Sequence, residues 1–309
     1  MLFKKMPKRV YINEVAVRDG FQSEPDFVPT GQKIALIDRL SRSGLAKIEV
    51  TSFVSPKAIP NLRDAAEVMA GIAREPGVTY VALIANERGC ERALAAKVDE
   101  INLVMSIGEK HNLANMRMTC EQSLEQFGRV MQLVKGTGVR VNGTIATAFG
   151  CPFEGDQPVA RVLWAAEQYL NMGMDAITLT DTTGMGHPAQ VNDVVSALFE
   201  VNPYVPLTLH FHNTRGIGLA NVIAAVEAGV VSFDASLGGI GGCPFAPGAT
   251  GNICTEDLVH MLESSGINTG VDLDALLAIA RGLPQLLGHD VPGQVLKAGK
   301  RTAVHRTSA

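Results

Sequence analysis

Short β-branched runs alternate with longer amphipathic segments along this chain, and that alternation restricts its fold more than any other feature. We predict strands over 10–17, 47–53, 79–84, 100–106, 140–146, 176–180, 207–212 and 231–236. The intervening helix patterns cover 30–43, 62–74, 87–96, 120–137, 158–172, 188–201 and 218–228. Units of roughly 30 residues, repeated in this way, favour an α/β fold of the closed (β/α)8 TIM-barrel type.

An open doubly wound sheet is the alternative. It predicts a G-x-G-x-x-G phosphate turn after the first strand, but that strand leads instead into Arg18-Asp19-Gly20. After the last strand, 255–287 shows helix patterns and 288–309 reads as a polar, basic tail. We therefore expect a catalytic barrel over 1–254 and a C-terminal helical extension over 255–309 that packs on the barrel and is not independent.

The composition narrows the classes of partner. With 309 residues, 46% of them hydrophobic, the chain can bury a large core, and a net charge of -4 argues against nucleic-acid binding. Five cysteines form no CxxC pair, which is typical of reduced thiols in a cytoplasmic protein. No apolar run reaches the length of a membrane span, so no membrane partner is expected.

Active sites of such barrels lie at the C-terminal ends of the strands, so the polar residues at those ends are the candidates. They are Arg18 and Asp19; Glu49, Thr51 and Ser52; Ser106; Thr144 and Thr147; Asp181 and Thr182; and His210 and His212.

Two histidines and a carboxylate in this set suit a divalent metal ion. His210 and His212 point to the same side of a strand, Asp19 can join them, and Asn252 can add an amide oxygen. Ligation by nitrogen and oxygen without thiolate favours Mg²⁺ or Mn²⁺, with Zn²⁺ or Fe²⁺ as alternatives. The competing interpretation is that the histidines belong to the core and bond backbone carbonyls.

The other charged candidates also have two interpretations each. Arg18 is either one half of a structural ion pair with Glu49 or a cation that stabilises an enolate. Asp181 is either a helix cap or a catalytic group. Cys243, in a glycine-rich loop over 238–252, is either a buried thiol of a turn or a proton donor to substrate.

Six motifs occur in order along nearly the whole chain: R-D-G-F-Q at 18–22, E-V-T-S-F-V-S-P-K at 49–57, F-G-C-P-F-E-G at 149–155, D-T-T-G at 181–184, H-F-H at 210–212 and G-G-C-P-F-A-P-G-A-T-G-N at 241–252. Together they resemble the 3-hydroxy-3-methylglutaryl-CoA (HMG-CoA) lyase family. The R-D-G-x-Q and H-x-H motifs also occur in related synthases and carboxyltransferases, whereas the cysteine loop is specific.

The resemblance implies a metal-dependent retro-Claisen cleavage of HMG-CoA to acetyl-CoA and acetoacetate, as in leucine catabolism. Four residues would hold the ion: Asp19, His210, His212 and Asn252. Arg18 would stabilise the enolate, Glu49 would hold Arg18, Asp181 would be a base or an orienting group, and Cys243 would donate a proton. The resemblance places substrate contacts at Gln22, Ser52, Thr182, Lys57 and Asn115, and it implies a homodimer.

Three positions depart from the family pattern. Asn213 stands where an aspartate is usual after H-x-H, Arg215 replaces a neutral residue, and Thr180 replaces a glycine. These changes leave the expected ligands intact but leave open a related substrate, such as citramalyl-CoA or an isoprenoid-extended homologue. A condensing synthase of the same barrel group and a metal-binding barrel without activity are the further alternatives.

Overall fold

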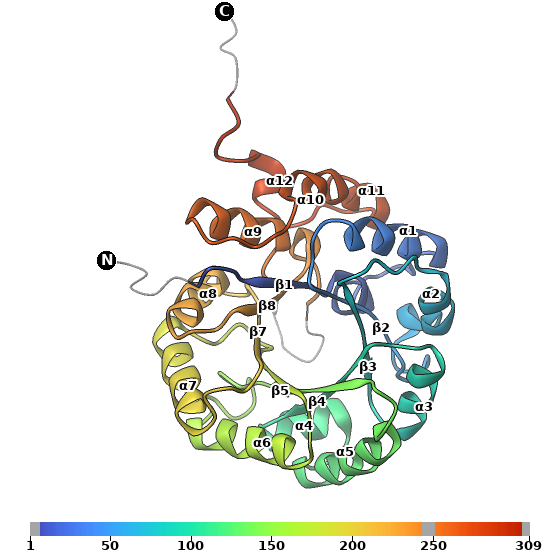
Figure 1. Cartoon of the computed structure of the whole chain (residues 1–309), viewed down its shortest axis with the longest axis vertical. Coiled ribbons are helices and arrows are strands. Elements are labelled where there is room, and N and C mark those ends of the chain that lie inside the picture. The colour runs from blue at the N-terminus through green and yellow to red at the C-terminus, as the bar shows by residue number, and fades with distance from the viewer. Residues whose placement is uncertain (1–6, 243–250, 305–309) are drawn as a thin grey trace, which may run out of the picture.

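A computed structural model of the chain describes residues 7–242 and 251–304. Eight parallel strands close into a barrel in the order of the sequence, so the predicted TIM barrel is confirmed (Figure 1). The strands are β1 (Tyr11–Glu14), β2 (Lys47–Ser52), β3 (Thr79–Ile84), β4 (Glu100–Ser106), β5 (Arg140–Ala146), β6 (Ala176–Asp181), β7 (Leu207–Phe211) and β8 (Ser232–Ala235). Within the described ranges, no helix combines the length and the apolar character that crossing a membrane requires.

Helices surround the strands, and a further group follows β8. Around the ring lie α1 (Thr30–Ser41), α2 (Ala65–Gly71), α3 (Glu87–Ala95), α4 (Glu109–Met116), α5 (Cys120–Val134), α6 (Val159–Asn171), α7 (Pro188–Val201) and α8 (Gly218–Glu227). The later helices are α9 (Thr255–Ser264), α10 (Leu273–Ala280), α11 (Leu283–Leu287) and α12 (Val295–Ala298). Three short helical turns complete the elements: η1 (Ala16–Gly20), η2 (Pro60–Leu62) and η3 (Leu237–Gly239).

The first strand is shorter than predicted. The apolar pattern continues to Val17, but β1 ends at Glu14, and the π-helix η1 follows. The Glu14 carboxylate accepts the backbone N–H of Ala16 at 2.8 Å, and the Val15 carbonyl accepts the N–H groups of Arg18, Asp19 and Gly20. These bonds take the chain out of the ladder, so Arg18 and Asp19 lie on a helical turn above the barrel and not on the strand itself.

One helix prediction needs correction, and two helices of the structure were not predicted. The predicted helix 62–74 divides into η2 and α2, because Asp64 between them binds Thr30 and Lys33. Helix α4 was missed because two of its buried residues, His111 and Asn112, are polar and bond Ser106. The expected tail contains α12, whose first N–H groups bond the Asp257 carboxylate.

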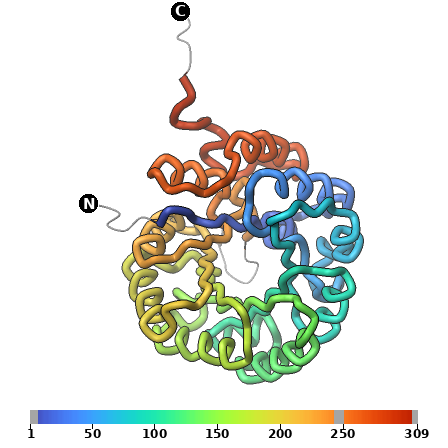
Figure 2. Tube along the Cα trace, viewed as in Figure 1, coloured from blue at the N-terminus to red at the C-terminus, as the bar shows by residue number. Residues whose placement is uncertain are grey.

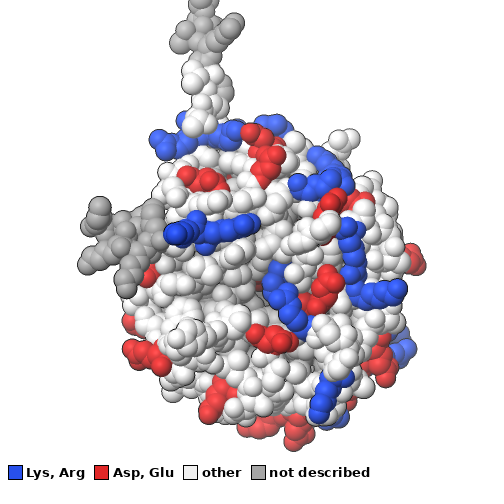
Figure 3. Space-filling model, in the orientation of Figure 1, with Lys and Arg blue, Asp and Glu red and all other residues white. Residues whose placement is uncertain are grey.

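The apolar core lies between the strands and the helices, and α9 to α11 contribute to it through residues such as Leu258, Leu276 and Leu283. These helices lie beyond β1, beside α1 (Figure 1). The chain trace shows β1 next to β8, where the ring closes (Figure 2). On the face of the molecule drawn in Figure 3, acidic and basic side chains are interspersed.

Candidate active site

Arg18 is the cation of the site, and two carboxylates hold it. Its Nε donates to Glu49 Oε2 at 2.5 Å and its Nη1 to Asp19 Oδ1 at 2.6 Å. The Arg18 side chain is 12% exposed and that of Glu49 only 4%. Burial alone would lower the pKa of the guanidinium, but the charges of Glu49 and Asp19 raise this pKa above its ordinary value. Arg18 is therefore a fixed, permanently charged group with a defined orientation.

Asp19 joins this cation to the two histidines of β7. Ligand atoms of Asp19, His210 and His212 all lie within 4.8 Å of one another, and the three residues are buried. The two Nε2 atoms of the histidines are 3.4 Å apart. Burial alone would raise the pKa of Asp19, but Arg18 and the two histidines hold this pKa below its ordinary value. An ionised carboxylate beside two imidazoles is the donor set expected for a divalent cation.

Asn252 reaches the same cluster from the far end of the glycine-rich loop. Its Nδ2 donates to Asp19 Oδ2 at 2.7 Å, and its Oδ1 is buried without a hydrogen-bond partner. A buried carbonyl oxygen with no partner costs free energy unless a ligand meets it. Nitrogen and oxygen donors with an unused amide oxygen fit a hard divalent ion such as Mg²⁺ or Mn²⁺.

Glycines let the two stems of this loop approach the cluster. Gly241 has a φ of +99°, and a Cβ there would lie 2.7 Å from Asn252 Nδ2. At Gly251 a Cβ would lie 1.7 Å from the Gly239 carbonyl oxygen. Any larger residue at these positions would separate Asn252 from Asp19. Cys243, the predicted proton donor, lies outside the described residues.

The Asp181 carboxylate bonds backbone groups of the loop that follows it. Its carboxylate accepts the N–H groups of Met185 and Gly186 at 2.9 and 3.1 Å, and burial raises its pKa to about 6. The sequence suggested a helix cap or a catalytic group, but the N-cap of α7 is His187, and Asp181 bonds the turn that precedes it. In the sheet Asp181 pairs with Phe211 of β7, and it is not one of the residues of the described ligand cluster.

The two unusual residues after H-F-H bond the backbone. Arg215 Nη1 donates to the carbonyls of Thr183 and Gly184 at 3.0 and 2.8 Å. Asn213 Oδ1 accepts the N–H of Gly218 at 3.1 Å at the start of α8. These side chains therefore fix two neighbouring loops. Thr180 differs, because its hydroxyl oxygen is buried without a partner.

The five expected substrate contacts fall into three groups. Gln22 Nε2 donates to Asp19 Oδ1 at 2.7 Å, so this residue is next to the cluster. Ser52 is buried and accepts the N–H of Val54, and Thr182 accepts the N–H of Thr147. Lys57, after β2, and Asn115, in α4, are exposed. The structure thus brings Gln22 to the cluster and leaves Lys57 and Asn115 at the surface.

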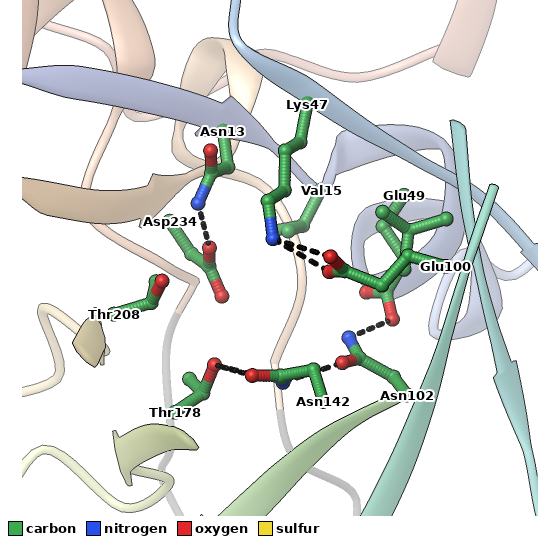
Figure 4. Close-up of a pocket in the computed structure, with 11 residues that line it drawn as sticks. Asn13, Val15, Lys47, Glu49, Glu100, Asn102, Asn142, Thr178, Thr208 and Asp234 are labelled. Carbon is green, nitrogen blue, oxygen red and sulfur yellow. Dashed lines mark hydrogen bonds and ion pairs between the residues drawn. The ribbon is translucent and has the colours of Figure 1, made fainter. Parts of the chain in front are cut away.

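Sequence reasoning missed the polar layer inside the barrel. Asn102 Nδ2 donates to Glu49 Oε1 at 2.8 Å, and Asn102 Oδ1 accepts Asn142 Nδ2 at 2.6 Å (Figure 4). In the same layer, Asp234 Oδ2 lies 3.2 Å from His210 Nδ1. Strand alternation could have revealed this layer, because residues two positions apart lie on the same face of a strand. Asn102 shares a face with Glu100 in β4, and Asn142 shares one with Thr144 in β5. Buried amides among apolar strand residues need partners, and Asn102 finds one in Glu49.

Known proteins resemble this chain over most of its length. The HMGL-like family model matches residues 9–282. A hydroxymethylglutaryl-CoA lyase of Bacillus subtilis is 44% identical over 95% of this chain and 98% of its own length. The mitochondrial hydroxymethylglutaryl-CoA lyase of Homo sapiens is 41% identical over 95% of this chain and 90% of its own length.

A solved structure shows the same relationship in three dimensions. It is an HMG-CoA lyase from Acinetobacter baumannii in complex with coenzyme A and 3-methylmalate, and it matches with a TM-score of 0.94 and 54% sequence identity. The alignment covers 97% of this chain and 98% of that one. With the barrel, the cluster of Asp19 and two histidines, and these relatives in agreement, the chain belongs to the hydroxymethylglutaryl-CoA lyase family of carbon–carbon lyases.

Proposed function

We propose that this protein cleaves HMG-CoA to acetyl-CoA and acetoacetate with the help of Mg²⁺ or Mn²⁺. The observation that supports this most is the contact between Arg18 and Asp19, which places a permanent cation beside the cluster of metal-ligand residues. Relatives named as hydroxymethylglutaryl-CoA lyases at 41–44% identity support the choice of substrate.

The proposed ligands are Asp19, His210, His212 and Asn252. A divalent ion held by these residues would make the 3-hydroxyl of the substrate more acidic and would help to orient the substrate. The Asp19 oxygens already accept bonds from Arg18, Gln22 and Asn252, so this carboxylate is oriented before substrate arrives. Little reorganisation is then needed on binding.

In the proposed reaction a base takes the 3-hydroxyl proton, and the hydroxyl carbon becomes the ketone of acetoacetate. The electron pair of the broken C–C bond passes to the acetyl-CoA fragment as a thioester enolate. Arg18 is the proposed partner for this negative oxygen, because Glu49 and Asp19 fix its guanidinium. A proton then adds to the enolate carbon, and Cys243 is the proposed donor.

The two departures from the family pattern after H-F-H are weaker evidence for another substrate once their contacts are known. Arg215 and Asn213 bond backbone groups of the neighbouring loops, which gives no specific reason to prefer a larger or differently charged acyl group. We therefore retain HMG-CoA over citramalyl-CoA or an isoprenoid-extended homologue. The same contacts offer nothing that favours a condensing synthase.

The test is direct. Purified protein is treated with EDTA, reloaded with Mg²⁺ or Mn²⁺, and assayed for acetoacetate from HMG-CoA. We expect turnover only with metal, with citramalyl-CoA cleaved at least tenfold less efficiently. Metal-loaded, folded protein that yields no acetoacetate would refute the substrate, and equal turnover after EDTA would refute the role of the metal.

A further inference from the structure

Asp234 lies in β8, inside the barrel and directly beside His210. Its Oδ2 is 3.2 Å from His210 Nδ1, while the Nε2 atom on the other side of the imidazole ring is 3.9 Å from Asp19 Oδ2. The two nitrogens of His210 thus face different carboxylates. Only Nε2 is on the side of the proposed metal ligands.

This arrangement selects one orientation and one tautomer of the ring. A carboxylate can only accept, so Asp234 holds the proton of His210 on Nδ1 and leaves the Nε2 lone pair for a cation. In metal sites such a bond from the second ring nitrogen orients the histidine and makes it a better ligand.

Asp234 is itself held from the neighbouring strand. Asn13 in β1 donates from Nδ2 to Asp234 Oδ1 at 2.9 Å and to Ser232 Oγ at 3.2 Å, as Figure 4 shows for the first of these bonds. Each carboxylate oxygen therefore has its own donor, Asn13 for Oδ1 and His210 for Oδ2. The side chain is 14% exposed, so water competes little for either oxygen.

We infer that Asp234 is a positioning residue for the metal site, and that the chain of bonds from Asn13 through Asp234 to His210 raises the affinity for a divalent cation. This inference rests on the proposed function, because it takes His210 as a metal ligand. Asp234 does not belong to the ligand cluster itself. Its influence is exerted through His210.

The experiment measures Mn²⁺ binding to the full-length protein without acyl-CoA, from the electron paramagnetic resonance signal of free Mn²⁺. Asp234→Asn keeps the size of the side chain but leaves one oxygen for two donors, so we expect the Kd for Mn²⁺ to rise about 10- to 100-fold. Asn13→Ala acts one bond further away and should raise the Kd by a smaller factor.

Asn142→Ala is the matched control. Asn142 is buried in the same polar layer, but it bonds Asn102, Thr144 and Thr178 and no proposed ligand, so the Kd should stay within about twofold of the wild-type value. Thermal melting of metal-free protein checks that each variant folds. If Asp234→Asn fails to fold, the Asn13→Ala measurement decides.

A Kd for Asp234→Asn within twofold of wild type would overturn the inference, and so would an equal loss in Asn142→Ala. Wild-type protein that binds no Mn²⁺ would overturn both the inference and the proposed metal site. If wild type binds Mn²⁺ but produces no acetoacetate, the substrate assignment fails, while the variants still decide the role of Asp234.

Discussion

Replacing Glu49 by glutamine tests the claim that Arg18 is held by two carboxylates. Glu49 accepts Arg18 Nε at one oxygen and Asn102 Nδ2 at the other. Glutamine has a single acceptor oxygen, so one of these two buried donors loses its partner and the ion pair disappears. Breaking a buried pair in this way typically costs about 3–5 kcal/mol. Arg18 keeps Asp19 at 2.6 Å, so we expect the lower end, about 3 kcal/mol.

The assay is urea unfolding followed by far-UV circular dichroism, with unfolding free energies compared only if the dependence on urea is unchanged. Glu87→Gln is the control, because Glu87 pairs with Arg129 at the surface, where their side chains are 34% and 58% exposed. Such a pair contributes about 1 kcal/mol or less. Equal losses in the two variants would refute the reasoning. In Glu49→Gln, kcat should also fall roughly 10- to 100-fold, because Glu49 no longer fixes Arg18.

Four further outcomes are expected. Arg18→Ala should lower kcat at least a hundredfold at saturating metal, and an unchanged kcat would remove Arg18 from the reaction. Asn252→Ala should raise the Kd for Mn²⁺ roughly tenfold, measured as above, because the buried Oδ1 is lost. Burial raises the pKa of Glu14 from 4.5 to about 7. The contribution of Glu14 to stability is therefore fully present below pH 4.5, and roughly 3 kcal/mol is lost as the pH rises through 7. Glu14→Gln should abolish this loss, which is measured from the free energies of unfolding at pH 4.5 and pH 8. Arg215→Gln should leave the Kd for Mn²⁺ within twofold and lower the melting temperature, and a tenfold change in Kd would contradict its role as a loop contact.

The barrel could be predicted because each strand is recognisable from a short local stretch of sequence. The predicted ranges 79–84, 100–106 and 140–146 coincide with β3, β4 and β5, because apolar and β-branched residues recur in each of them. The end of β1 could not be predicted in this way. There Glu14 bonds the N–H of Ala16 close by and that of Leu237 far away in the chain, and the second contact is invisible to any local pattern.

Asp19, His210 and His212 were expected to lie together and they do, because they end or follow strands of the barrel. What the sequence could not give is the direction of each side chain. Arg215 replaces a neutral residue of the family pattern, and nothing in the sequence indicates that its guanidinium turns to the carbonyls of Thr183 and Gly184. Asp234 was overlooked because its importance comes from His210, which is 24 positions away and adjacent only once β7 and β8 pair.

The bond between Asn252 and Asp19 spans 233 positions of sequence and lies close to where β1 meets β8. No partly assembled barrel contains this site, because its donors come from the first strand unit and from the seventh and eighth. An ion that binds only the closed ring stabilises it by about 2.7 kcal/mol at one hundred times its Kd. That stabilisation acts against opening of the β1–β8 seam. Metal binding would therefore slow the hydrogen exchange of the backbone amides along this seam, outside the active site.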